Sequence, residues 1–115
     1  MAVRTATPAL LAHGAVLYTW TGLLNGDTGT PVEVPGHADK TAQIEGTFGA
    51  GGTCVIQGSN DGTNYQSLTD PQGNAISKTA AAIEMVEEHT RYIRPNITAG
   101  DGTTSLTVTL MAKRT

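Results

Sequence analysis

The clearest alternation of polar and apolar positions lies in residues 41–48. One face carries Ala42, Ile44, Gly46 and Phe48, and the other carries Thr41, Gln43, Glu45 and Thr47. A period of two over this length predicts a β-strand with one face toward solvent. Glycine-rich turns at residues 49–52 and 59–62 lead into further strands at residues 53–58 and 63–68. We therefore expect a three-stranded antiparallel meander, because Asp-Gly sequences supply the positive φ angles of tight hairpins.

Two later segments alternate in the same way. Residues 103–113 give the longest regular alternation, with an inward face made of Leu106, Val108, Leu110 and Ala112. Residues 91–98 place Ile93, Pro95 and Ile97 on the inward face. Because proline cannot donate a backbone hydrogen bond, Pro95 predicts an edge strand or a β-bulge. The intervening residues 99–102 are rich in glycine and predict a hairpin turn.

The segment at residues 14–22 is apolar on both faces, with Ala15 and Leu17 on one and Val16, Tyr18 and Trp20 on the other. This pattern predicts a strand that is central in its sheet or covered by a partner. Shorter strands are expected at residues 75–78 and at residues 31–34, where flanking prolines suit an edge position. Residues 83–88 indicate an outer strand, and an amphipathic helix over residues 79–89 is the alternative.

Roughly seven to nine short strands separated by turns predict an all-β protein. The expected fold is a single antiparallel β-sandwich, with a jelly roll as its topology. We assign this domain to residues 14–115 and describe residues 1–13 as an extended N-terminal arm, because they lack alternation and contain Pro8. The arm is either a frayed terminus or a segment whose Leu10 and Leu11 pack on a neighbouring subunit.

Composition narrows the range of functions. A chain of 115 residues is expected to form one domain. Its net charge is −3 and its seven basic residues are dispersed, whereas nucleic-acid binding needs a clustered basic face. The single cysteine, Cys54, excludes an internal disulfide framework and is expected to be a buried small hydrophobe. No segment reaches the length of a membrane span or a signal-peptide core, so a soluble protein made inside the cell is expected.

No arrangement of residues in the sequence predicts catalysis. The three histidines, His13, His37 and His89, are separated and are expected to be exposed loop residues without a second metal ligand. The acidic residues in turns, such as Asp27, Asp61 and Asp101, are explained by turn chemistry, although calcium binding is an alternative. Nucleophile, phosphate-loop and zinc-protease motifs are missing from the sequence. We therefore expect no catalytic residue, no cofactor and no metal site.

Two groups of motifs resemble known families. Residues 56–65, followed by residues 91–95, resemble the Ser-Asn-Asp-Gly and Arg-Tyr-Ile-Arg patterns of discoidin-like, galactose-binding-like jelly rolls. From about residue 16 to its end, the chain is similar to small structural proteins of tailed bacteriophages. The motifs that carry this second resemblance are residues 60–64, 70–74, 91–95 and 98–103. Size and compactness resemble those of capsid decoration proteins, also called cement or staple proteins.

The second resemblance implies a structural virion protein that binds the outside of a phage capsid and stabilises neighbouring major capsid subunits. It implies synthesis in the host cytoplasm, a location on the capsid exterior, and assembly as a homodimer or homotrimer, without nucleic acid or membrane partners. The residues expected to contact other subunits are Val3, Leu10, Leu11, Val16, Tyr18 and Trp20. The alternative is a carbohydrate- or receptor-binding module of a phage tail or fibre, in which Trp20, Tyr65 or Tyr92 would stack on a sugar.

Overall fold

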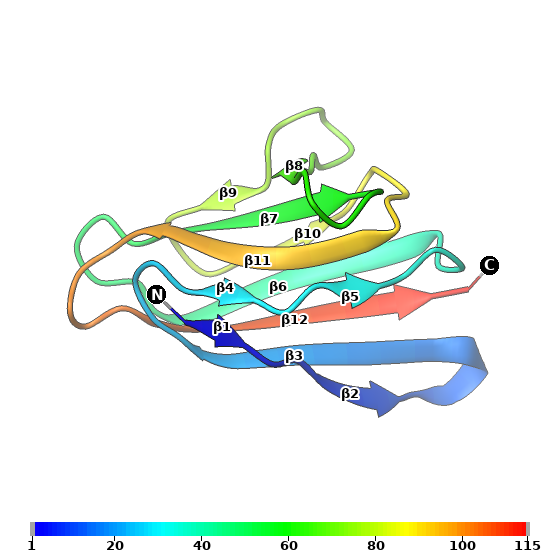
Figure 1. Cartoon of the computed structure of the whole chain (residues 1–115), viewed down its shortest axis with the longest axis horizontal. Coiled ribbons are helices and arrows are strands. Elements are labelled where there is room, and N and C mark those ends of the chain that lie inside the picture. The colour runs from blue at the N-terminus through cyan, green and yellow to red at the C-terminus, as the bar shows by residue number, and fades with distance from the viewer. Residues whose placement is uncertain (1, 115) are drawn as a thin grey trace.

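The computed structural model describes residues 2–114 and shows two β-sheets packed face to face (Figure 1). The predicted all-β sandwich is confirmed. The seven-stranded sheet contains β1 (Val3–Arg4), β4 (Thr28–Gly29), β5 (Val32–Glu33), β7 (Thr53–Ser59), β8 (Gln66–Ser67), β9 (Ser77–Lys78) and β11 (Tyr92–Ala99). The five-stranded sheet contains β2 (Thr7–Leu10), β3 (Ala15–Leu23), β6 (Asp39–Thr47), β10 (Ala82–Met85) and β12 (Ser105–Lys113).

Strands that follow one another in sequence mostly lie in opposite sheets. From β3 onward the chain passes to β4 and β5, back to β6, across to β7, β8 and β9, and then through β10, β11 and β12 in alternate sheets. The resulting orders, β3-β12-β6-β10 and β4-β11-β7-β8, are those of a jelly roll. The expected topology is therefore confirmed.

The predicted meander at residues 41–68 is wrong in its first half. β6 pairs with β10 and β12, whereas β7 pairs with β11, β8 and β9, so the turn at residues 49–52 crosses between the sheets instead of closing a hairpin. The second half is confirmed, because β7 and β8 pair antiparallel. The predicted hairpin at residues 99–102 is likewise a crossover, from β11 to β12. Local turn chemistry is the same in both cases, and only the pairing of distant strands distinguishes them.

The two crossovers lie side by side and are bonded to each other (Figure 1). Asp101 accepts the backbone N–H of Ala50 at 2.9 Å, and Thr104 Oγ1 donates to the carbonyl oxygen of Phe48 at 2.7 Å. Asp101 also accepts the N–H and hydroxyl of Thr103 at 2.9 and 2.6 Å. Gly49 has φ +71°, and a Cβ there would meet the Asp101 carboxylate, so this close approach requires glycine.

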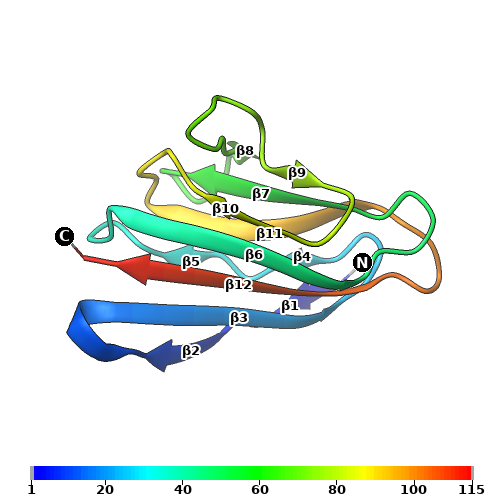
Figure 2. The ribbon, with the colours of Figure 1, turned by 180° about the vertical axis from the view of Figure 1, so that it is seen from behind.

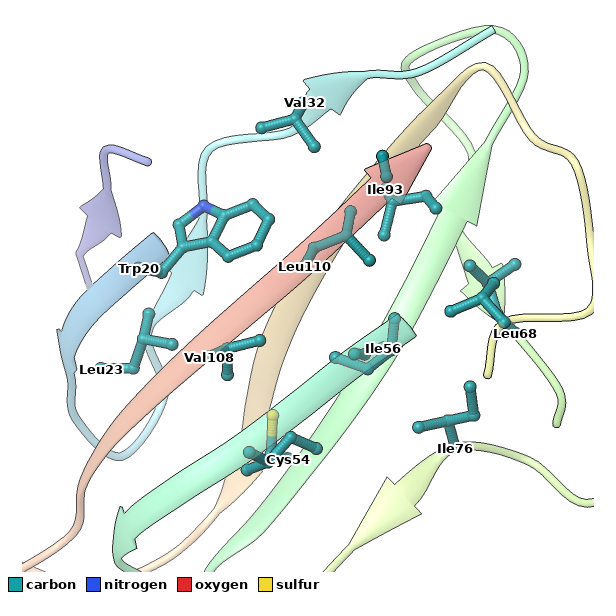
Figure 3. Packing of buried hydrophobic residues seen from close by; sticks show 14 of the residues in the cluster. Trp20, Leu23, Val32, Cys54, Ile56, Leu68, Ile76, Ile93, Val108 and Leu110 are labelled. Carbon is teal, nitrogen blue, oxygen red and sulfur yellow. The ribbon is translucent and has the colours of Figure 1, made fainter. Parts of the chain in front are cut away.

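The core fills the space between the sheets (Figure 3). The residues predicted to point inward on β12 and β11 are buried: Leu106, Val108, Leu110, Ala112, Ile93, Pro95 and Ile97. Cys54 is fully buried, as predicted, and burial raises the pKa of its thiol to about 12. Trp20 is 1% exposed and donates its indole N–H to the Thr30 carbonyl at 3.0 Å.

Pro95 was predicted to lie in an edge strand or at a β-bulge. It lies in the internal strand β11, so the edge prediction is wrong. The one irregularity in the pairing of β11 with β7 lies between Ile97 and Ala99, and Pro95 is outside it. Ile97 donates its N–H to Asp27 in the segment that leads into β4, and Pro95 faces the same side because it is two residues away. On that side the ladder is interrupted between β4 and β5, so no ladder hydrogen bond requires a donor at Pro95.

Residues 82–85 form an outer strand, β10, and the outer-strand prediction is confirmed over the helical alternative. Val86, which broke the predicted alternation, is fully buried just beyond the strand. Residues 32–33 pair with β11 on one side only, which confirms an edge position for β5.

The N-terminal arm predicted at residues 1–13 is extended, but the sandwich itself holds it. β1 pairs parallel with β4, and β2 pairs antiparallel with β3. The arm therefore adds one strand to each sheet and is continuous with the domain predicted at residues 14–115. Met1 and Thr115, the outer limits of these two predicted segments, lie outside the described residues.

The bond between the crossovers predicts an acid-dependent loss of stability. The hydrogen bonds from Thr103 and Ala50 lower the pKa of Asp101 from 3.8 to about 2. A lowered folded-state pKa contributes stability above the unfolded-state pKa, and this contribution is lost as the pH falls toward 2. We expect Asp101→Asn to lower the melting temperature at pH 6 and to reduce the further drop between pH 5 and pH 2, measured by circular dichroism. An unchanged acid dependence in the variant would contradict this role.

Candidate functional site

A hollow lies at the end of the sandwich formed by β2, β3 and the chain's C-terminal end. It has a volume of about 440 Å³ and is lined by Leu10, Leu11, Gly14, Ala15, Val16, Tyr18, His37 and Arg114. We call it the N-terminal concavity. Four of the residues predicted to contact other subunits meet here: Leu10, Leu11, Val16 and Tyr18. Its lining is mainly apolar, with the imidazole of His37 and the charged Arg114 beside the apolar residues.

A tight turn presents the two leucines. His13 and Gly14 both have positive φ angles, 61° and 76°, and Leu11 donates its N–H to the Ala15 carbonyl at 2.8 Å. The turn folds β2 back along β3 and leaves Leu10 89% exposed and Leu11 43% exposed. Leucine side chains at such exposure are available to a partner at little cost in internal packing.

The remaining predicted contact residues are distributed differently. Val3 is 67% exposed on β1 but does not line the concavity. Val16 is largely buried, and only Tyr18 on the same face is half-buried. The prediction of Trp20 as a contact residue is wrong because its side chain lies in the core, where Gly29 leaves room for the ring (Figure 3). β3 has two apolar faces, and the sequence alone did not distinguish the inner one.

Asp27 anchors the N-terminal strand. Its carboxylate accepts the backbone N–H groups of Ala2 at 2.8 Å and Leu24 at 2.9 Å, and the guanidinium Nε of Arg4 at 3.0 Å. Burial opposes the charged form, but these donors together hold the pKa of Asp27 below its usual value. Turn chemistry explains the contact to Leu24, as predicted, whereas the contacts to Ala2 and Arg4 join distant parts of the chain.

A buried lysine lies beside the concavity, which the sequence did not indicate. Lys40 is 1% exposed, and its Nζ donates to the His37 carbonyl at 3.0 Å and lies 3.5 Å from Nδ1 of His89. Burial lowers the pKa of Lys40 and that of His37, whose pKa is lowered further by nearby Arg114 and Lys40. His37 and His89 also line a smaller hollow with Pro35, Gly36 and Ala38. The prediction that these two histidines are separated from each other is therefore wrong.

The outer face of the five-stranded sheet is a second exposed surface, turned toward the viewer in Figure 2. The strand register aligns two rows of outward side chains across this sheet. One row is Met85, Thr41, Met111, Leu17 and Ala9, and the other is Ile83, Gln43, Thr109, Thr19 and Thr7. Both rows are uncharged, and Ile83, Met85 and Met111 are 61%, 45% and 37% exposed. We call these rows the uncharged face.

The loop that carries the Ser-Asn-Asp-Gly motif is bonded internally. The Asp61 carboxylate accepts the Ser59 hydroxyl at 2.8 Å and the N–H groups of Thr63 and Asn64 at 2.9 and 2.8 Å. These donors hold the pKa of Asp61 well below its usual value. Asp61 therefore organises the loop itself, which accounts for the motif without a ligand.

The aromatic residues beside this loop are already partly covered. The guanidinium of Arg94 lies 3.8 Å from the ring centre of Tyr65, and that of Arg91 lies 5.0 Å from the ring centre of Tyr92. Arg91 is also paired with Glu33 at 2.6 Å. One face of each tyrosine ring is thus occupied by an arginine.

Residues 2–114 contain neither a metal-binding cluster nor a membrane-spanning helix. No cluster of three or more histidine, cysteine, aspartate or glutamate side chains in this range has the arrangement of a metal site. In the same range, no helix has the length and apolar character needed to cross a membrane.

The strand order defines the class as a small jelly-roll protein, and several apolar side chains are exposed on it. No protein-family model and no curated protein matches its sequence. Among solved structures, it is similar to the SPBc2 prophage-derived protein YomS, with a TM-score of 0.65 and 11% identity over 90% of this chain and 98% of YomS. It is also similar to BH2720 from Bacillus halodurans, with a TM-score of 0.51 and 9% identity over 96% of this chain and 70% of BH2720. At these identities the likeness establishes a shared fold.

Removing the Asp27 carboxylate tests how the N-terminal strand is held. Asp27→Ala leaves the N–H groups of Ala2 and Leu24 without their acceptor and Arg4 without its partner. We expect the free energy of unfolding, measured in urea, to fall by about 2–4 kcal/mol. Hydrogen exchange should speed up in β1 and β4 first. The exposed Asp39→Ala is the control, and equal losses in the two variants would rule out a specific anchor.

Proposed function

We propose that this chain is a structural virion protein that binds the outer surface of a phage capsid and stabilises neighbouring major capsid subunits. The observation that carries the proposal is the pair of exposed leucines, Leu10 and Leu11, at the N-terminal concavity. The fold shared with a prophage-derived protein supports a phage origin. The motifs similar to those of tailed-phage structural proteins support the same assignment.

The contact would work by burying apolar surface. Leu10 and Leu11 project at the turn, and the hollow beside them can receive an apolar side chain of the capsid subunit. Full burial of a leucine is worth about 1.5–3 kcal/mol, so these two residues alone can supply several kcal/mol. The charged Arg114 at the same hollow favours an acidic residue next to that apolar side chain.

Stabilisation of the shell then follows by mass action. A protein that binds only the assembled state shifts the equilibrium toward assembly, and a site formed by neighbouring subunits exists only in the shell. Many copies act on one particle, so modest affinity at each site is sufficient. No chemical step is required of the bound protein.

The tail-module alternative receives less support from the structure. Stacking on a sugar needs an open aromatic face, but Trp20 is buried in the core. Arg94 and Arg91 cover one face of Tyr65 and Tyr92. The exposed apolar residues are aliphatic or sulfur-containing, and these suit protein contacts better than sugar stacking.

Charge substitution at the turn tests capsid binding. Deletion of the first eleven residues is unsuitable because it would remove β1 and β2 from the sheets. The double variant Leu10→Asp and Leu11→Asp should keep the wild-type melting temperature, because both side chains are exposed. Its affinity for capsids assembled without this protein should fall at least about 100-fold in co-sedimentation, since two apolar contacts are lost.

Leu24→Asp is the matched control, because Leu24 is 43% exposed like Leu11 but lies away from the concavity. It should bind capsids like the wild type. Wild-type protein that binds host glycans and not capsids would overturn the proposal in favour of the tail module. Unchanged capsid binding by the double variant would show that the concavity is not the contact.

A further inference from the structure

The uncharged face is the centre of a surface with the size of a protein interface. The five strands lie about 4.8 Å apart and rise about 3.4 Å per residue, so the two rows project to roughly 330 Å² and the whole outer face of the sheet, with its charged ends, to roughly 600 Å². Stable interfaces bury about 800 Å² on each partner, and the accessible area of a corrugated face exceeds its projection. The face also contains a hollow of about 310 Å³, lined by Leu17, Thr41, Gln43, Ile83, Thr109 and Met111.

Charged residues lie only at the ends of this face. Glu45 follows the row of Gln43 on β6, and Asp39 and Lys113 lie opposite each other beyond the row of Met111. An uncharged centre with charges at its margins is the usual composition of a protein interface, where charged residues are depleted from the core and retained at the rim. The matching partner surface must therefore be uncharged as well.

The distribution of side-chain size points to a second copy of the chain. The bulky Ile83 and Met85 lie on β10 at one edge of the sheet, whereas the small Thr7 and Ala9 lie on β2 at the other. A two-fold axis parallel to the strands, lying in the plane between the two packed faces and directly above β12, would place β10 of one copy over β2 of the other. Bulky residues would then face small ones, with Met111 of each copy meeting at the axis.

We propose that two copies of this chain form a dimer by packing their uncharged faces together about that axis. Such an interface uses the same patch on both copies and closes after two subunits. Addition of further strands at the free edge of β2 is hindered. The N–H of Leu11 points toward β3, and N–H positions alternate along a strand, so the nitrogen of Pro8, three residues earlier, points to the free edge. Proline has no N–H to donate there. Leu10 and Leu11 do not belong to this face, so the dimer is independent of the proposed capsid contact.

Light scattering during size-exclusion chromatography tests the dimer. The wild-type protein should elute with twice the mass of the chain at about 100 μM. Met111→Lys and Ile83→Lys should each raise the dimer dissociation constant at least about 30-fold while keeping the wild-type melting curve, since both side chains are exposed. Leu24→Lys, an exposed residue outside the face, is the matched control and should remain dimeric. A monomeric wild type, or dimeric lysine variants, would overturn the proposal.

Cross-linking tests the axis. Met111→Cys should be joined to itself by a short bismaleimide, because the two copies of this position meet at the axis. Thr7→Cys, which is exposed on β2, should not be joined to itself, because it faces β10 of the other copy. The native Cys54 does not interfere, since it is fully buried. Efficient linking of Thr7→Cys together with no linking of Met111→Cys would overturn this arrangement.

The two proposals can be separated in one set of proteins. Leu10→Asp with Leu11→Asp should stay dimeric even where capsid binding is lost. If no variant or wild-type protein binds capsids but the wild type is a dimer sensitive to Met111→Lys, the capsid proposal fails and the dimer stands. If the wild type binds capsids as a monomer, the dimer proposal fails alone.

Discussion

The two side-by-side crossovers at one end of the sandwich are the constraint on which the rest of the structure depends. β6 pairs with β12 in one sheet and β7 pairs with β11 in the other, so the chain must change sheets after both β6 and β11. Asp101 and Thr104 join the two crossing segments. Once these central pairs are stacked, their alternating residues meet as one core, and the edge strands can only be added outside them.

Three aspartates of this protein hold backbone segments in place. Asp27, Asp61 and Asp101 each accept at least two backbone N–H groups, and each has a lowered pKa. A carboxylate that accepts several N–H groups satisfies donors that a loop would otherwise leave unpaired, which stabilises the charged form. These residues are therefore committed to the fold, and the contacts proposed above rest on the exposed apolar surfaces instead.

Both surfaces arise from the way the edges of the sandwich are completed. The N-terminal segment supplies β2, which covers one edge of β3 and turns Leu10 and Leu11 outward beside the concavity. The same strand adds Thr7 and Ala9 to the uncharged face at the edge opposite β10. An arm that was free in solution would provide neither surface, so the Asp27 contacts that hold β1 also support the surfaces proposed for binding.

The sequence by itself determined the fold class, the main strands and the inward residues of β11 and β12, because a period of two directly marks a face of a strand. It also marked Leu10, Leu11 and Tyr18, which the structure brings together. Only the tertiary structure decided whether a glycine-rich turn closed a hairpin or a crossover, which face of β3 held Trp20, and where the N-terminal segment lay. Each of these features depends on pairing between strands that are distant in sequence, and so do the rows of the uncharged face. Local sequence patterns carry no information about such pairing.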